Sequence, residues 1–373
     1  MSQLLRVLGT AAGAVAQVLL IAGVGVAGAL YPKRQPLLTA EALRSVSRLA
    51  NDIFLPFLSA AVLGARINVD ALKEDWVLLP AGLVVTVFGY CVADVSALVF
   101  RPTPAVAPAL RVAIAHPNAF ALPLLLLRSL CDHAVVAAEF GGDEDECVER
   151  GAAKLCVYLT AWHVIFWTYA YSHLERLGDS EHRADASAVR PRLWLRRVLL
   201  QPNMLGVYAG VAIGVSPLRR LLFRGGTTPL RPLGLAIETL GEPVVATTVL
   251  IMAAALANGA VRQRREKGDA TAEDDDDDRP LATAGWIVVC KLMAVPAVGF
   301  PLVALLPGLG KLTRLVLLLQ LSMPGAQTVL VTLNAIGAGH VAEKVAPSYL
   351  VQYLTAVPTL TMFVAWALLI TYR

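Results

Sequence analysis

Charged residues are scarce in this chain, and their scarcity excludes an ordinary soluble protein. Only 16% of the 373 residues are Asp, Glu, Lys or Arg, whereas 57% are hydrophobic. Soluble domains typically carry about 25% charged residues. Because the apolar residues form long runs, the composition predicts an all-α polytopic membrane protein surrounded by a lipid bilayer. The net charge of +4 is small, so no nucleic acid is expected as a partner.

Sequence motifs of enzymes are also missing. The chain contains no GxSxG, no HExxH and no pair of catalytic acids on one apolar stretch. His116 lies within an apolar stretch but has no second metal ligand four residues away. We therefore expect no enzymatic activity, no metal and no cofactor. No A-x-A cleavage pattern is followed by a soluble domain, so the first apolar run is interpreted as a span and not as a signal peptide.

Cysteine is rare, and two of the five cysteines flank an acidic segment. Cys131 and Cys147 enclose the sequence AEFGGDEDE, and their spacing allows either a disulfide or two free thiols. Basic residues gather on the cytoplasmic side of membrane proteins, and the connector at 176–200 is rich in arginine. With that connector in the cytoplasm, both termini and the acidic segment are predicted to be non-cytosolic, where disulfides can form.

Long apolar stretches recur along the whole chain. A hydrocarbon core of about 30 Å needs roughly 20 apolar residues per helix. We count ten stretches of this kind, at 8–30, 43–65, 76–100, 109–131, 151–175, 202–222, 230–258, 283–306, 314–337 and 348–371. The aromatic residues between Trp162 and Tyr171 are interpreted as the interfacial end of the fifth span.

Two of these spans are interrupted near their centres. The fourth contains His116-Pro117-Asn118 and the ninth contains Met323-Pro324-Gly325. Proline donates no N–H and clashes with the preceding turn, so each interruption frees backbone groups at a depth without water. Paired interruptions in two halves of a membrane protein indicate a transporter site near the midplane.

An internal repeat supports this pairing. The second span reads LANDIFLPF and the seventh LAIETLGEP, while the fifth and tenth share the sequence Tyr-Leu-Thr-Ala at 158–161 and 353–356. We therefore predict a first five-helix repeat at 1–175, a short cytoplasmic connector at 176–200 and a second repeat at 201–373. The odd number of spans per repeat inverts the second repeat. A disordered acidic loop is expected at 261–280.

Several segments resemble those of a known family in the same order. They are Pro117-Asn118 with a following Leu122-Pro123-Leu124, residues 199–223, VVCKLMAVP at 288–296, Met323-Pro324-Gly325-Ala326, and Tyr353. On these segments the chain resembles the auxin efflux carrier family over nearly its whole length, and within it the PIN-LIKES branch with its short central connector. The resemblance implies ten helices with spans four and nine crossing, a homodimer, and transport of auxin-like weak organic acids. It also implies the endoplasmic reticulum membrane, with the plasma membrane as the alternative.

The residues of the two breaks are the candidates for binding a substrate. Asn118 can cap the half-helix that follows it and bind an anion, or it can merely satisfy backbone groups freed by Pro117. Pro117 and Pro324 shape the breaks, Gly325 supplies backbone groups, and Gln327 is a polar partner shortly after the second break.

His116 borders the first break and has a side chain that titrates near neutral pH. Three roles stay open for it: assisting anion binding, carrying a proton, or bonding to freed carbonyl groups.

Charged residues within the spans are a second group of candidates, for charge coupling. An unpaired charge costs roughly 3 kcal/mol or more in hydrocarbon, so each should have a partner. Asp52 and Glu238 match between the repeats and favour static ion pairs, whereas Asp94 and Lys291 suit either an ion pair or proton coupling. Lys154 and Lys291 are the expected countercharges.

These observations predict a secondary transporter of auxin-like organic acids that works by alternating access with an elevator-like movement. One alternative is a sodium- or proton-coupled carrier with related crossed helices, although no acidic residue adjoins either break. Another is a membrane receptor that binds a hormone without moving it.

Overall fold

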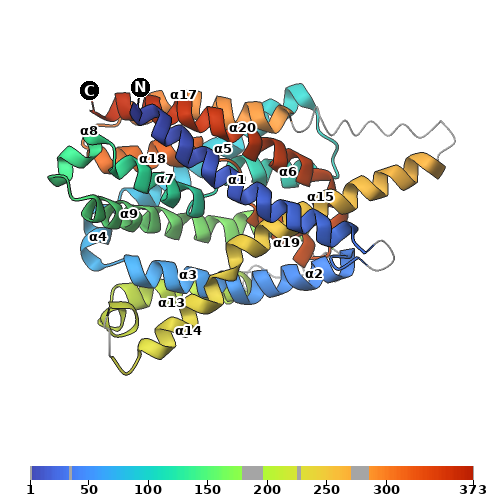
Figure 1. The fold of residues 1–373 in the computed structure, drawn as a ribbon, viewed down its shortest axis with the longest axis horizontal. Helices are drawn as coiled ribbons and strands as arrows, with labels where there is room; N and C mark the ends of the chain where they lie inside the picture. The colour runs from blue at the N-terminus through green and yellow to red at the C-terminus, as the bar shows by residue number, and fades with distance from the viewer. Residues whose placement is uncertain (1, 33–35, 179–195, 225–227, 270–284, 373) are drawn as a thin grey trace.

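The structure of the protein is a computed structural model that describes residues 2–32, 36–178, 196–224, 228–269 and 285–372. All regular secondary structure in these ranges is helical, and most helices run roughly along the long axis of the molecule (Figure 1). Five described helices are long and apolar enough to cross a membrane, or six if one bent pair counts as a single span. The protein is therefore an integral, multi-pass membrane protein.

The first part of the chain is helical over most of each predicted span, with the fourth span interrupted between α6 and α7. Its helices are α1 (Ser2–Leu30), α2 (Ala40–Leu49), η1 (Ala50–Phe54), α3 (Leu55–Arg66), α4 (Val69–Glu74), α5 (Leu78–Phe100), α6 (Ala107–Ala115), α7 (Ala121–Cys131), α8 (Ala134–Ala137), η2 (Ala138–Phe140), α9 (Glu144–Ile165), η3 (Phe166–Ala170) and α10 (Tyr171–Glu175). Side chains of Thr39, Asn68 and Asp143 cap α2, α4 and α9 by accepting a backbone N–H. These caps fix where the three helices begin.

The second part is also helical. Its helices are α13 (Pro202–Gly214), η4 (Arg220–Arg224), α14 (Arg231–Gly241), α15 (Pro243–Asp269), η5 (Val289–Ala294), α17 (Val295–Ala304), α18 (Lys311–Ser322), α19 (Thr328–Ala335) and α20 (Gly339–Tyr372). The loop expected at 261–280 is wrong over its first part, because α15 continues through Asp269. The rest of that loop, and most of the connector at 176–200, lie outside the described residues.

Length and composition alone select fewer spans than the ten predicted. The five are 40–66, 78–100, 231–264, 285–304 and 339–372, and the bent pair is α7 with the segment 134–140, at 78°. The other predicted spans are helical but are shorter, interrupted or more polar, as with α9, whose first turn holds three acids. The ten-span inverted repeat stays a prediction.

Small residues allow some of the helices to pack closely. Gly206, Gly210 and Gly214 recur every four residues on α13 and face α3. A Cβ atom at Gly210 would lie 2.8 Å from the carbonyl oxygen of Ser59, and one at Gly206 would collide with the carbonyl oxygen of Pro56. This small-residue stripe brings the two backbones together, as in many membrane helix pairs.

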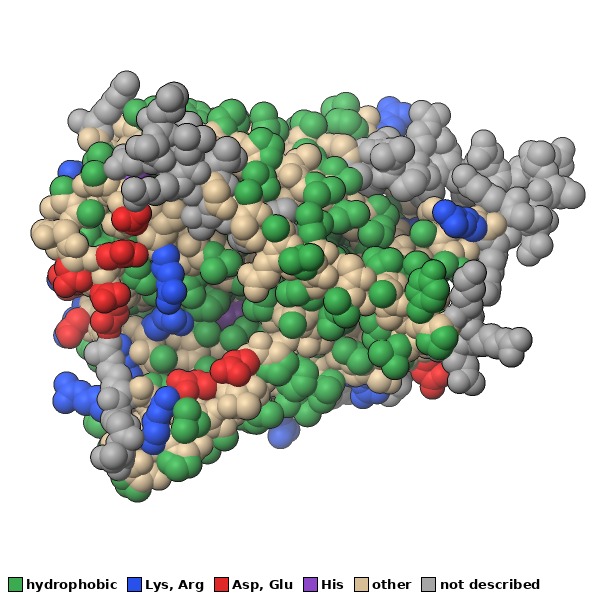
Figure 2. All heavy atoms as spheres, viewed as in Figure 1, with side chains coloured by type: hydrophobic (Ala, Val, Ile, Leu, Met, Phe, Trp, Pro, Cys, Tyr) green, Lys and Arg blue, Asp and Glu red, His purple; other side chains and the backbone are tan. Residues whose placement is uncertain are grey.

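The surface separates apolar from charged regions. Figure 2 shows hydrophobic side chains over the middle of the molecule, while most acidic side chains of this face gather at the end where α4 and α8 lie. An apolar middle with charge at an end is the distribution expected when the middle faces lipid.

Candidate functional site

The two interrupted segments meet inside the molecule. The first interruption separates α6 from α7, and the second separates α18 from α19. Asn118 donates its backbone N–H to the carbonyl of Pro324 at 2.8 Å, and Ala326 donates its own to the carbonyl of His116 at 3.0 Å. These two bonds form an antiparallel bridge between Pro117 and Gly325. Each break thus satisfies part of the backbone that the other leaves free, which a buried segment requires.

Polar side chains of α18 and α20 satisfy further backbone groups of the breaks. Gln352 accepts the N–H of Gly325 at 2.9 Å. Tyr349 donates its hydroxyl to the carbonyl of Ala326 at 3.1 Å. Gln320 donates its amide to the carbonyl of Ala119 at 2.9 Å. Neutral polar groups within apolar stretches are costly, and this signal could have identified Gln320, Tyr349 and Gln352, but neutral polar candidates were sought only at the breaks themselves.

A cavity of about 470 Å³ lies beside the contact between the breaks. Its lining includes the residues that lead into α7 and into α19, together with side chains of α1, α3, α9, α15 and α20. Among the described residues, no Asp, Glu, Lys or Arg belongs to this lining. The N-terminal ends of both half-helices therefore face the cavity, where their free N–H groups and dipoles favour an anion.

Asn118 and Gln327 are the two predicted binding residues that line the cavity. The amide of Asn118 donates to the hydroxyl of Tyr353 at 2.9 Å, and Tyr353 lines the cavity as well. Gln327 accepts the hydroxyl of Thr248 at 3.1 Å. The two breaks thus present amide and hydroxyl groups side by side.

The other predicted binding residues lie behind this wall. Pro117, Pro324 and Gly325 are buried in the contact between the breaks and do not line the cavity. His116 is fully buried and also lies outside the lining; its Nε2 atom is 3.3 Å from the hydroxyl of Tyr90. His116 is therefore not placed to bind a substrate in this cavity directly. Its ring instead packs edge-on against Trp162, at 5.6 Å between centroids.

A further expectation, that the aromatic residues of the fifth span lie at the membrane interface, is wrong for the residues of α9 that face α3. Trp162 and His163 do not lie at an interface but are buried and line the cavity. The Nε2 atom of His163 lies 3.4 Å from the hydroxyl of Ser59 on α3. Trp162 stacks on Phe166, with 4.9 Å between ring centroids. Aromatic spacing alone could not separate these buried rings from an interfacial belt.

The charged candidates have partners different from those expected. Asp94 accepts from Arg111 at 2.8 Å, not from Lys291. Lys154 pairs with Asp75 at 2.6 Å.

In the matched pair of acids, Glu238 lies 3.3 Å from Arg231, and Asp52 is exposed and accepts from the amide of Asn51. Lys291 is 1% exposed on η5. None of these residues lines the cavity, so charge coupling through them stays a prediction. The described residues hold no group of three His, Cys, Asp or Glu placed to bind a metal.

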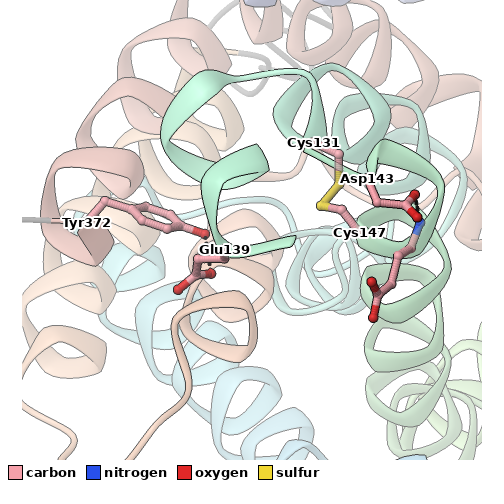
Figure 3. The surroundings of a disulfide bond; sticks show 6 residues. Cys131, Glu139, Asp143, Cys147 and Tyr372 are labelled. Atoms are coloured by element: carbon pink, nitrogen blue, oxygen red, sulfur yellow. Dashed lines mark hydrogen bonds between the residues drawn. A yellow bond between two sulfur atoms is a disulfide. The ribbon is translucent and has the colours of Figure 1, made fainter. Parts of the chain in front are cut away.

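The acidic segment closes one end of the molecule. Cys131, at the end of α7, forms a disulfide with Cys147 in the first turn of α9 (Figure 3). Glu139, between them, accepts the hydroxyl of Tyr372 at 3.1 Å and lies 3.5 Å from Lys311. The last turn of α20 therefore lies at the same end as the disulfide.

Interrupted helices that meet beside an uncharged cavity, in a multi-pass helical protein, define the class of membrane transport proteins. The family described as "Membrane transport protein" matches residues 10–364. The chain belongs to this family, which is that of the auxin efflux carriers.

Two similar relatives come from Arabidopsis thaliana. Protein PIN-LIKES 1 is 22% identical over 275 residues, which cover 66% of this chain and 57% of the relative. Protein PIN-LIKES 7 is 23% identical over 380 residues, covering 87% of this chain and 89% of the relative. The chain thus matches little more than half the length of the first relative and most of the second.

Proposed function

We propose that the protein is a secondary transporter of auxin-like weak organic acids, of the indole-3-acetate type, and that it works by alternating access. One observation carries the proposal: the residues leading into two half-helices, Asn118 among them, line a cavity that has no charged side chain among its described lining residues. Pockets for small molecules commonly have volumes of roughly 300–1,000 Å³, and this cavity falls in that range.

The chemistry of the lining suits an aromatic carboxylate. The carboxylate would accept hydrogen bonds from the amide of Asn118, the hydroxyl of Tyr353 and the N–H groups at the start of α7 and α19. Because these donors are neutral, binding an anion here leaves no buried cation behind when the anion departs. The indole ring would pack among the apolar side chains and Trp162, all of which line the cavity.

We extend the proposal to an elevator-like movement within a ten-span inverted repeat. The cavity lies between α1, α3 and α15, from predicted spans one, two and seven, and α7, α9, α19 and α20, from predicted spans four, five, nine and ten. In this proposal predicted spans one, two, six and seven form a fixed scaffold. Predicted spans three to five and eight to ten, which include α5 and α18, move with the substrate. A site at the boundary of two groups is what such a movement needs.

The family resemblance supports a homodimer in the endoplasmic reticulum membrane, with the plasma membrane as the alternative. We place both termini on the non-cytosolic side. The position of Tyr372 beside Glu139 supports this for the C-terminal end, because the neighbouring disulfide belongs in an oxidising compartment.

Replacement of Asn118 tests the site. In proteoliposomes containing the purified chain, Asn118→Ala is expected to lower uptake of radiolabelled indole-3-acetate at least about tenfold, because it removes a donor worth about 1.5–3 kcal/mol to a charged acceptor. Asn258→Ala is the matched control: Asn258 donates to the carbonyl of Leu38 at 3.3 Å and does not line the cavity. Unchanged uptake by Asn118→Ala would show the site to be wrong. Binding without uptake by the wild type would favour a receptor.

A further inference from the structure

A row of residues on one face of α3 leads from the cavity to a cation. Leu55, Leu58, Ser59 and Val62 line the cavity and are spaced three or four residues apart, so they share one face of the helix. The next position on that face is Arg66, in the last turn of α3. The helix runs toward the end of the molecule where α4 and α8 lie (Figure 1).

Arg66 contacts the cavity wall through an aromatic ring. Its Cζ atom lies over the ring of Phe120, 5.6 Å from the ring centroid. Phe120 lines the cavity and immediately precedes α7, one of the two half-helices that face it. A guanidinium lying over an aromatic face keeps its N–H groups at its edge, where they can bind a carboxylate through two parallel bonds.

Among the described residues, no carboxylate forms an ion pair with Arg66. Three other arginines of the described chain do form such pairs: Arg111 with Asp94, Arg150 with Glu146 and Arg231 with Glu238. Arg66 is nevertheless partly buried. A partly desolvated cation without a counterion attracts anions from solution more strongly than a paired one does.

We propose that Arg66, held against Phe120, forms an anion-capture site at the mouth of the cavity nearest α4 and α8, where it first engages the carboxylate of the substrate. The inference rests on the proposed function and adds a specificity-determining residue to it. The carboxylate would then pass along the α3 face to Asn118 and the half-helix ends. Arg66 would select anions over neutral molecules of the same shape, a selection that the uncharged cavity lining supports only through dipoles.

The experiment measures uptake kinetics of indole-3-acetate in proteoliposomes for the wild type, Arg66→Gln and Arg66→Lys. Removing the charge with Arg66→Gln is expected to raise KM about tenfold, to leave Vmax within about twofold, and to flatten the dependence of uptake on ionic strength. Arg66→Lys should recover part of the loss, because the charge remains but the two-pronged geometry does not. Binding of the neutral analogue indole-3-acetamide should not change.

The matched control is Arg150→Gln. Arg150 lies over the ring of Phe140 at 5.9 Å, so it makes the same kind of contact, but it is mostly exposed and paired with Glu146. Its replacement should leave KM and the salt dependence as in the wild type.

Two results would overturn the capture site. One is wild-type kinetics and salt dependence in Arg66→Gln; the other is an equal loss of indole-3-acetate and indole-3-acetamide binding, which would mean that Arg66 only stabilises the end of α3. Equilibrium binding to the detergent-solubilised protein separates this proposal from transport itself. If binding depends on Arg66 but the wild type shows no uptake, only the proposed transport function is overturned. If uptake is normal and Arg66→Gln behaves like the wild type, only the capture site is overturned. Absence of both uptake and binding overturns both.

Discussion

At the scale of single residues, the contact between the breaks depends on positions where only one kind of residue fits. Gly325 donates its N–H to Gln352, and a Cβ atom at this position would lie 2.8 Å from the carbonyl oxygen of Ala113. That oxygen belongs to the backbone of α6 and cannot move without moving the helix. The role of Gly325 is therefore to let the two broken segments approach, while Asn118 and Tyr353 present polar groups to the cavity.

Gly325→Ala tests this role. Forcing a methyl group between two packed backbones typically costs about 1–3 kcal/mol. We expect the variant to be less stable by this amount in thermal unfolding of the detergent-solubilised protein, and to lose most uptake, because the breaks are pushed apart. Gly23→Ala is the control, since nothing lies within 4 Å of a Cβ atom built there. If both variants unfold and transport like the wild type, the close approach of the backbones at Gly325 is not needed for stability or transport.

At the scale of helices, the disulfide between Cys131 and Cys147 joins the half-helix α7 to α9. Both helices line the cavity, so the bond holds one wall of the site together at one end. The contacts of Glu139 with Lys311 and Tyr372 tie the same segment to α18 and α20. The acidic segment thus connects the far ends of four helices of the proposed moving group.

Removal of the disulfide should lower stability more than it lowers substrate affinity. For a sequence separation of 16 residues, the chain-entropy estimate of the stabilisation is about 3 kcal/mol. We expect Cys131→Ser with Cys147→Ser to unfold at a lower temperature, and to keep a KM for indole-3-acetate within about threefold of the wild type. Cys290→Ser, at a buried free cysteine, is the control. A full loss of binding in the double variant, with unfolding unchanged, would contradict this structural role.

At the scale of the whole molecule, the proposed elevator movement requires α9 to move against α3. The two helices touch where the thiol of Cys156 lies 3.7 Å from the carbonyl oxygen of Val62. Val62→Cys puts a second thiol on the residue whose backbone the native thiol of Cys156 contacts, across the proposed boundary. Oxidation of this variant should stop uptake of indole-3-acetate, because it locks the two helix groups together.

The control for this cross-link lies within one group. A Cβ atom at Gly82 on α5 would lie 3.0 Å from the Cβ atom of Ala161 on α9, and both helices belong to the proposed moving group. Oxidised Gly82→Cys with Ala161→Cys should keep the uptake of its reduced form. If the oxidised Val62→Cys protein still transports at its unoxidised rate, α3 and α9 do not move apart during transport.

The features that could be predicted from the sequence are those that depend on single residues and their neighbours along the chain. Membrane class follows from long apolar runs, because hydrocarbon excludes exposed backbone and charge. The interruptions at Pro117 and Pro324 follow from the missing N–H of proline, and both segments are in fact non-helical. Family membership follows from similar segments that occur in the same order along nearly the whole chain.

Contacts between segments that are distant in the chain could not be predicted from local chemistry. Which carboxylate neutralises which cation depends on helix rotation and depth, so the pairing of Asp94 with Arg111 rather than Lys291 emerged only in three dimensions. For the same reason the rings at 162–166 were placed at an interface, although Trp162 and His163 line the cavity. Sequence spacing defines one face of one helix, whereas a cavity is made by faces of several.

The sequence by itself determined that this protein is a membrane protein, that it belongs to the auxin efflux carriers and that two of its helices are interrupted. Those properties arise from single residues and their near neighbours. Only the tertiary structure decided that the breaks bond to each other through Asn118 and Ala326, that His116 does not line the cavity, and that Arg66 lies over the ring of Phe120, which does. The reason is physical: a binding site is set by groups distant in the chain, and their meeting is the result of packing.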